Sequence, residues 1–106
     1  MKEYNKLIRD NIPAIIASTG KHAEIEVLED NTIIAALKNK LEEEVKEVIE
    51  ASDREEVLEE LADVLEIVDS LAREHGWNLE DVLKKKEEKR ALRGGFEKRL
   101  FLKHVE

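Results

Sequence analysis

The chain has 106 residues, of which 42% are charged and 4% are aromatic, and its formal net charge is -8 at pH 7. This length suits a single domain over residues 1–106 with one modest core. The charge disfavours a nucleic-acid-binding surface, and a chain without cysteine has neither disulfides nor a thiolate metal site. No apolar run approaches membrane-spanning length, and the N-terminus lacks the apolar stretch of a signal peptide. We therefore expect a cytoplasmic protein without membrane or nucleic-acid partners.

The N-terminal part of the chain predicts one short helix and one short strand. Proline is tolerated in a first helical turn and glycine commonly ends a helix, so the sequence predicts a helix from Pro13 to about Ser18, before Gly20. Residues 24–28 read EIEVL, which alternates polar and apolar side chains and includes β-branched ones. That pattern is typical of a strand.

Two long amphipathic helices are predicted in the middle of the chain. The first covers about 30–51, and a second extends from Asp53 to about 75, just before Gly76. Asp53 suits the N-cap of the second helix, and Glu56 three residues later completes a capping-box pattern. Because few residues separate the two helices, they can fold back into an antiparallel hairpin.

A fourth helix is predicted from Leu79 to about Leu92, with Asn78 as its cap. The two glycines at 94–95 break this helix and permit positive φ. The segment 96–105 then forms an extended stretch or a short strand, and the sequence leaves open whether it pairs with 24–28 in a minor two-stranded hairpin. The predicted fold class is all-α.

Two acidic pairs, Glu44 with Glu47 and Glu60 with Asp63, lie on the two long helices. Each pair has i,i+3 spacing, so its carboxylates lie on one helix face. The pairs are symmetric about the connection near residue 53, so an antiparallel hairpin brings Glu47 level with Glu60 and Glu44 level with Asp63. Four clustered carboxylates repel one another and are costly to desolvate, so such a cluster normally needs cations. Hard divalent ions, Mg²⁺ or Mn²⁺, suit oxygen ligands.

A simpler interpretation exists for the same residues. Glutamate is a good surface helix former, and any Glu-rich helix contains i,i+3 acidic pairs by chance. Spacing alone therefore leaves an ordinary solvated acidic face as an alternative to a metal site.

The basic residues gather at the two ends of the chain. Lys89 and Arg93 are four residues apart near the end of the fourth predicted helix, where they can clamp a phosphate or simply complement the helix dipole. Lys6 and Arg9 precede the first helix, and a solvated segment explains their charges equally well. An acidic cradle with a separate basic segment suits an anionic substrate that binds through a metal ion.

Several stretches together resemble the MazG-like all-α nucleoside triphosphate pyrophosphatases. The sequences EVKE at 44–47 and ELAD at 60–63, with twelve residues between them, are similar to the Glu-x-x-Glu and Glu-x-x-Asp pattern of that family. YNKLIRDNIP at 4–13 and RGGFEKR at 93–99 are similar to the terminal signatures of one subgroup, described as phosphoribosyl-ATP pyrophosphatase-like or house-cleaning. The resemblance spans nearly the whole chain. Asn11 stands where a lysine is common in the subgroup, so we do not expect Asn11 to contact phosphate.

The resemblance implies hydrolysis of a nucleotide between its α and β phosphates, giving a monophosphate and pyrophosphate. It implies that the four carboxylates bind Mg²⁺, with Mn²⁺ as a substitute, and that Glu44 or Glu47 is the catalytic base. It also implies that basic residues stabilise charge on the phosphates. These residues are Lys6, Arg9, Lys89 and Arg93.

A lone helical hairpin with few large apolar residues leaves apolar faces uncovered, so we expect a homodimer or higher homo-oligomer. The resemblance implies the same: a MazG-like helical bundle completed by oligomerisation. Two other functions stay open. One is action on phosphoribosyl-ATP itself, and the other is a non-enzymatic acidic helical module that binds a partner through its apolar faces.

Overall fold

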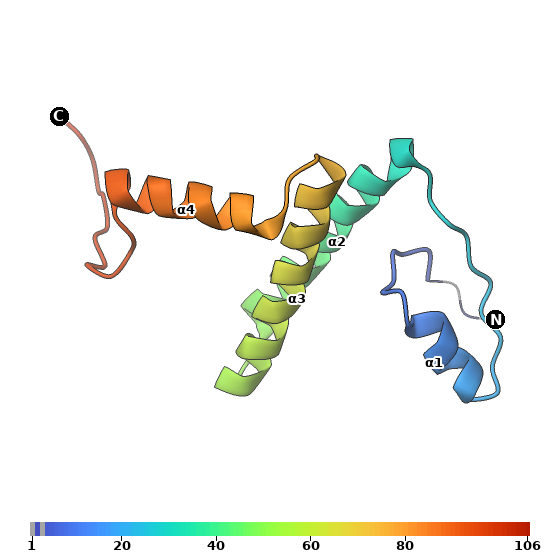
Figure 1. Ribbon diagram of the computed structural model, residues 1–106. Helices are drawn as coiled ribbons and strands as arrows, with labels where there is room; N and C mark the ends of the chain where they lie inside the picture. Colours follow the sequence, from blue (N-terminus) through green and yellow to red (C-terminus); the bar gives the residue numbers. More distant parts are fainter. Residues whose placement is uncertain (1, 3) are drawn as a thin grey trace.

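A computed structural model describes residue 2 and residues 4–106. Within them the chain forms four helices and no strand (Figure 1). The helices are α1 (Ile12–Ser18), α2 (Asp30–Glu50), α3 (Arg54–Glu74) and α4 (Leu79–Arg93). The predicted all-α fold class is confirmed, and each predicted helix is present at its expected place in the chain.

The centre of the fold is an antiparallel hairpin of α2 and α3. α2 ends at Glu50, and the next residue, Ala51, adopts an extended conformation with φ -63° and ψ 133°. Asp53 then caps α3, as predicted, by accepting a hydrogen bond from the backbone N–H of Glu56 at 2.8 Å. This short connection lets α3 pack directly along α2 (Figure 1). The apolar stripes of the two helices meet around Leu37 and Ala72, which are buried.

α4 leaves the end of α3 at a steep angle and projects away from the hairpin (Figure 1). Gly76 produces the sharp turn, because its φ of 82° lies in the left-handed region that glycine adopts readily. Asn78 and Asp81 then form a complete capping box, with two hydrogen bonds of 2.9 Å each. The direction of α4 is therefore fixed by this turn, and α4 packs against α3 but not against α2.

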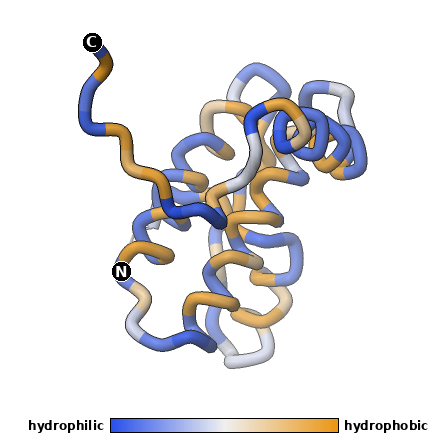
Figure 2. Tube along the Cα trace, turned by 90° about the vertical axis from the view of Figure 1, so that its left-hand side faces the viewer, coloured by the Kyte–Doolittle hydropathy of each residue, from blue (hydrophilic) through white to orange (hydrophobic). Residues whose placement is uncertain are grey.

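The predicted strand over 24–28 is wrong, and so is the optional hairpin between that segment and 96–105. In the described part of the chain neither segment has regular structure. Val27 is 89% exposed, whereas a stable strand needs a neighbouring ladder and a buried face. The alternating pattern belongs instead to the exposed connection between α1 and α2, and the C-terminal segment extends freely from the body of the molecule (Figure 2).

The described chain is open rather than compact. Its radius of gyration is 18.0 Å, whereas a compact domain of this size has about 13 Å. Large apolar side chains stay exposed along the outer side of the hairpin and in the C-terminal segment, where Phe96 is 97% exposed. None of the helices in the described residues combines the length and the apolar character that crossing a membrane requires.

Candidate metal centre

Three carboxylates converge between the two long helices. Glu44 and Glu47 come from α2 and Glu60 from α3, and each has an oxygen within 4.8 Å of an oxygen of the other two. The i,i+3 spacing places the first two on one face of α2, and the short connection to α3 brings Glu60 opposite them. The structure therefore brings together three of the four acidic residues that the sequence singled out.

The centre of this cluster is buried and incompletely paired. Glu44 is only 7% exposed, which is unusual for a glutamate unless it is paired. One of its oxygens lies 3.4 Å from the Lys40 ammonium, but its second oxygen, Oε2, is buried without a hydrogen-bond partner. Oε2 of Glu60 is buried and unpartnered in the same way. Buried carboxylate oxygens without partners are costly, so each needs a donor or a cation.

The crowding of negative charge perturbs Glu60. A hydrogen bond to Glu47, desolvation and then the negative charges of its acidic neighbours raise the pKa of Glu60 from its ordinary value of 4.5 to about 7. A shift in this direction means that the cluster favours a proton on Glu60, because three ionised carboxylates at this distance repel one another. A divalent cation would relieve the same repulsion.

The residues present fit a hard divalent cation. The donors are carboxylate oxygens only, which suits Mg²⁺ or Mn²⁺ and disfavours softer metals. Two of the oxygens have no hydrogen-bond partner among the described residues. Glu44, Glu47 and Glu60 would hold the ion.

Asp63, the fourth predicted ligand, lies beside the cluster but pairs with a residue of the N-terminal segment. Its Oδ1 accepts a hydrogen bond from Nη2 of Arg9 at 2.7 Å. Asp63 still acts on the cluster, because its negative charge contributes to the raised pKa of Glu60. Its role as a metal ligand stays a prediction.

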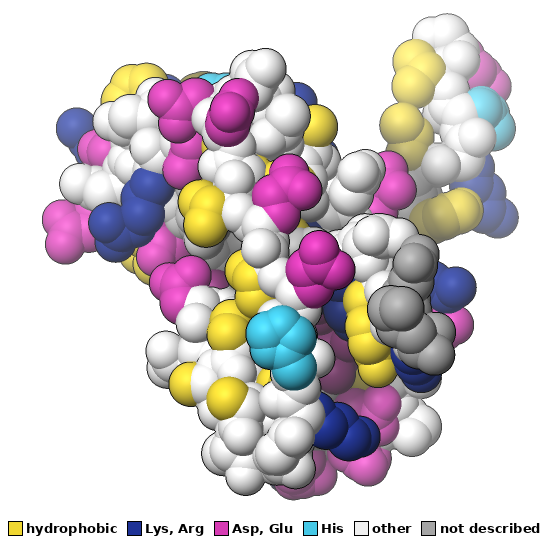
Figure 3. All heavy atoms as spheres, turned by 90° about the vertical axis from the view of Figure 1, so that its right-hand side faces the viewer, with side chains coloured by type: hydrophobic (Ala, Val, Ile, Leu, Met, Phe, Trp, Pro, Cys, Tyr) yellow, Lys and Arg dark blue, Asp and Glu magenta, His cyan; other side chains and the backbone are white. Residues whose placement is uncertain are grey.

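The N-terminal segment thus contributes cations to the edge of the centre. Besides the Arg9 contact on α3, Lys6 Nζ lies 3.9 Å from Oε1 of Glu43 on α2. On this face of the molecule, Lys and Arg side chains lie next to Asp and Glu side chains (Figure 3). Two of the four predicted phosphate-contacting residues are therefore near the carboxylates.

Sequence reasoning missed Lys40 as a residue of the site. Lys40 has a side chain only 15% exposed, and its ammonium lies 3.3 Å from Glu43 and 3.4 Å from Glu44. The signal was present in the sequence, because a lysine four residues before a glutamate shares its helix face. Lys40 partly offsets the charge of Glu44.

Lys89 and Arg93 are not brought to the carboxylates of the same chain. Both are exposed on α4, which points away from the hairpin (Figure 1). The neighbouring Arg90 pairs with Glu97 instead of a distant acid. The predicted role of these two residues therefore requires either another arrangement of α4 or a second chain.

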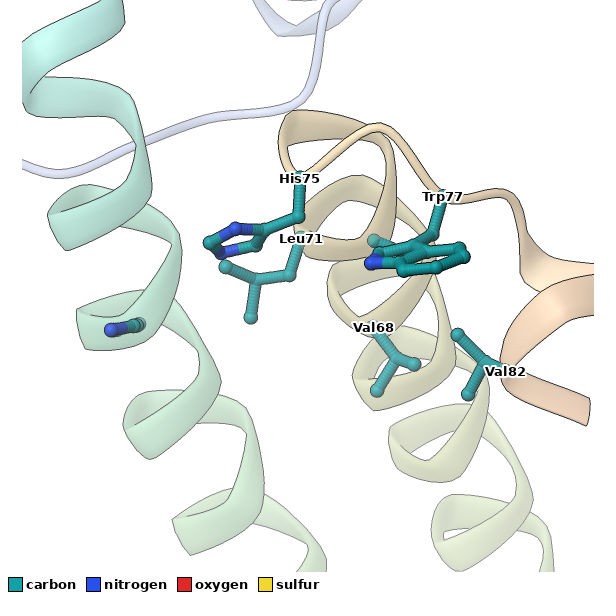
Figure 4. A pocket seen from close by; sticks show the side chains of 7 residues that line it. Val68, Leu71, His75, Trp77 and Val82 are labelled. Atoms are coloured by element: carbon teal, nitrogen blue, oxygen red, sulfur yellow. The ribbon is translucent and has the colours of Figure 1, made fainter. Parts of the chain in front are cut away.

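A separate, open apolar hollow of about 460 Å³ lies at the turn between α3 and α4. Figure 4 shows His75 and Leu71 extending from α3 toward α2, while Trp77 and Val82 lie near Val68. No carboxylate of the described residues lines this hollow, so it is distinct from the candidate metal centre.

The described chain is all-helical and carries clustered carboxylates on a helical hairpin. The pattern of the family described as "Phosphoribosyl-ATP pyrophosphohydrolase" matches residues 1–90. The chain belongs to this family, which is part of the MazG-like superfamily. The family's description is that of a pyrophosphohydrolase.

A curated relative adds no function. The chain is 43% identical over 54 residues to an uncharacterized protein of Mycolicibacterium smegmatis (strain ATCC 700084 / mc(2)155). The match covers 51% of this chain and 55% of that protein, so the chain spans about half the length of the curated relative it matches. No solved structure matches the chain.

Proposed function

We propose that this protein hydrolyses a nucleoside triphosphate to a monophosphate and pyrophosphate, with Mg²⁺ as its cofactor and Mn²⁺ as a substitute. The substrate is a non-standard nucleotide, as in house-cleaning enzymes. The proposal assigns the cation to Glu44, Glu47, Glu60 and Asp63. When bound, the ion supplies neutralisation of phosphate charge and activation of the attacking water.

One observation supports this function above the others: two buried carboxylate oxygens, on Glu44 and Glu60, have no partner within the described chain. A merely solvated acidic face would expose its carboxylates to water. Here carboxylate oxygens are buried between two helices. Burial of this negative charge is costly unless a cation is bound.

The side chains of this chain have separate roles in the proposed reaction. Glu44 or Glu47 accepts a proton from the attacking water as the catalytic base. Arg9 and Lys6, at the edge of the cluster, bind phosphate oxygens and stabilise the charge that develops on them.

Lys89 and Arg93 complete the proposed site from a partner subunit. They are exposed and separated from the carboxylates of their own chain, while the hairpin exposes an apolar stripe. This stripe consists of Val45, Ile49, Leu58, Leu61 and Leu65. Burial of such a stripe between two copies would stabilise a homodimer or higher homo-oligomer, and it would place α4 of one copy near the hairpin of the other.

Phosphoribosyl-ATP is a second candidate substrate, and the family match favours it. The chemistry is the same, because the bond broken again joins the α and β phosphates. The two candidates differ only in the group that must be recognised beyond the phosphates.

The test is metal-dependent pyrophosphate release, measured across a panel that includes both substrate classes. We expect Mg²⁺-dependent release by the wild type, and loss of both release and Mg²⁺ affinity in Glu60→Ala. Glu66→Ala, which changes an exposed glutamate on the same helix, is the matched control. A folded wild type that releases no pyrophosphate from any nucleotide would instead support the non-enzymatic interaction module, and a folded Glu60→Ala variant with normal metal affinity and turnover would overturn the assignment of the cation to Glu60.

A further inference from the structure

We propose that Arg9 is a displaceable counter-ion of the metal centre, which holds Asp63 until a divalent cation binds and then turns to the substrate phosphates. This inference rests on the proposed function, because it requires the cation site. It adds that binding of the cation and binding of the anionic substrate are coupled through one side chain.

The first basis is the contact itself. Arg9 and Asp63 lie 54 positions apart in the chain, yet Nη2 of Arg9 donates to Oδ1 of Asp63 at 2.7 Å. Only one nitrogen and one oxygen are joined, and the two side chains are 58% and 39% exposed. An exposed ion pair with a single hydrogen bond contributes little to stability. Exchange of this partner for a cation therefore costs the fold little.

The second basis is the negative charge of Asp63, which Arg9 partly neutralises while the two are paired. Asp63 lies one helical turn from Glu60 on α3, so its negative charge adds to that of the carboxylate cluster. A guanidinium on Asp63 offsets part of that charge before any metal ion arrives. A divalent cation would compete with Arg9 for the same carboxylate, because both need its lone pairs.

The third basis is the way the N-terminal segment is held. Leu7 and Ile8, immediately before Arg9, are half-buried, and Lys6 makes its own contact to Glu43 at 3.9 Å. The backbone next to Arg9 therefore has anchors that do not depend on the pair with Asp63. Release of the guanidinium leaves it at the edge of the carboxylate cluster, where the phosphates of a metal-bound substrate would lie.

The other cations near the cluster do not meet these conditions. Lys40 is only 15% exposed and is shared between Glu43 and Glu44, so it is built into α2. Lys6 contacts Glu43, which is outside the group of predicted ligands. A guanidinium also matches phosphate oxygens better than an ammonium, because it can donate two parallel hydrogen bonds.

Coupling of this kind has a thermodynamic signature. If cation binding frees Arg9 for the anion, anion binding must strengthen cation binding by the same factor. Removal of Arg9 should then have opposite effects on the two ligands: the cation loses a competitor, and the anion loses a donor.

Calorimetric titration of the full chain with Mg²⁺ alone, followed by inorganic pyrophosphate at saturating Mg²⁺, tests the proposal. Arg9→Gln is expected to bind Mg²⁺ about two- to fivefold more tightly than the wild type, as expected from the loss of an exposed ion pair. It is expected to bind pyrophosphate about tenfold more weakly. Arg73→Gln is the matched control, because Arg73 forms a similar pair on α3, with Asp69 at 3.0 Å, and it should change neither affinity.

The outcomes separate this inference from the proposed function. A folded wild type that binds no Mg²⁺ overturns both. If the wild type binds Mg²⁺ and Arg9→Gln binds Mg²⁺ equally or more weakly, the inference alone is overturned.

Arg9→Lys provides a second variant, because it keeps a positive charge beside Asp63 but loses the planar guanidinium. It should retain wild-type Mg²⁺ affinity and bind pyrophosphate more weakly, and unchanged pyrophosphate affinity in both Arg9 variants overturns the phosphate role.

Discussion

Glu60 on α3 and Glu47 on α2 bring carboxylate oxygens within 4.8 Å of each other across the hairpin, and Glu47 is the main cause of the raised pKa of Glu60. Two carboxyl groups this close can form a hydrogen bond only when one of them is protonated. Below about pH 7 the metal-free cluster therefore favours a proton on Glu60, where the proposed active form holds a cation. Metal and proton compete for the same place, and this competition gives the first prediction.

The stability of the metal-free protein should fall relative to Glu60→Gln as the pH rises from about 4.5 to about 7. Glu60 has a pKa of about 7 in the folded chain and an ordinary value of 4.5 in the unfolded chain. Between these values the folded state holds a proton that the unfolded state has lost, so a rise in pH favours unfolding. The stabilisation is complete below pH 4.5 and lost above about pH 7. Thermal unfolding in EDTA measures it, and a difference between the two proteins that does not change with pH contradicts the prediction.

Mg²⁺ should remove this pH dependence, because the ion displaces the proton and neutralises the cluster. The unfolding temperature of the wild type should rise with Mg²⁺ most strongly above pH 7, where Glu60 is ionised. Glu66→Gln, at an exposed position of α3, should respond to Mg²⁺ as the wild type does.

Asp63→Asn should separate stability from metal binding. The substitution removes an exposed pair with Arg9 but also relieves repulsion on Glu60, so the free energy of unfolding should stay within about 1 kcal/mol of the wild type. Mg²⁺ affinity should fall at least tenfold, roughly the minimum seen when groups that support a metal site are changed. Chemical denaturation and calorimetry measure the two effects. A large loss of stability would show that Asp63 is structural.

Arg93→Ala should reduce nucleotide turnover while Mg²⁺ affinity, measured without nucleotide, stays near the wild-type value. Loss of one charge-assisted hydrogen bond to phosphate corresponds to about a 10- to 100-fold effect on turnover. Lys85→Ala is the control, because Lys85 already pairs with Glu88 at 2.8 Å on the same helix. If Lys85→Ala impaired turnover and Arg93→Ala did not, the phosphate contact would belong to the other basic group.

The protein should form a dimer or larger oligomer at micromolar concentration. Leu58, Leu61 and Leu65 on α3 are all exposed in the single chain, and solvent contact of such a stripe is unfavourable. Leu61→Glu should shift the mass in sedimentation equilibrium toward the monomer, whereas Val27→Glu, at an exposed position between α1 and α2, should not. A wild-type protein that is monomeric at this concentration contradicts the prediction.

Features set by local sequence could be predicted, and features set by distant contacts could not. The caps at Asp53 and Asn78 depend on residues three positions away, and both are present in the structure. The strand over 24–28 was wrong because alternation alone does not supply a neighbouring strand. Local patterns thus predicted the helices but overestimated the sheet.

The same distinction holds for the candidate site. The convergence of Glu44, Glu47 and Glu60 was predictable, because helical periodicity and a short connection determine it. The contact of Arg9 with Asp63 was not, because no periodic pattern relates positions so far apart. The direction of α4, which separates Arg93 from the carboxylates, depends on one turn at Gly76 rather than on any repeating pattern.

Pyrophosphate release from a nucleotide panel tests the central claim most directly. The panel should include standard and non-standard nucleoside triphosphates and phosphoribosyl-ATP, each assayed with Mg²⁺ and with EDTA. We predict equimolar monophosphate and pyrophosphate from at least one of them, in Mg²⁺ only, and none from a folded Glu60→Ala variant. Undiminished turnover in EDTA, or no pyrophosphate from any nucleotide with folded, Mg²⁺-bound protein, would contradict the account.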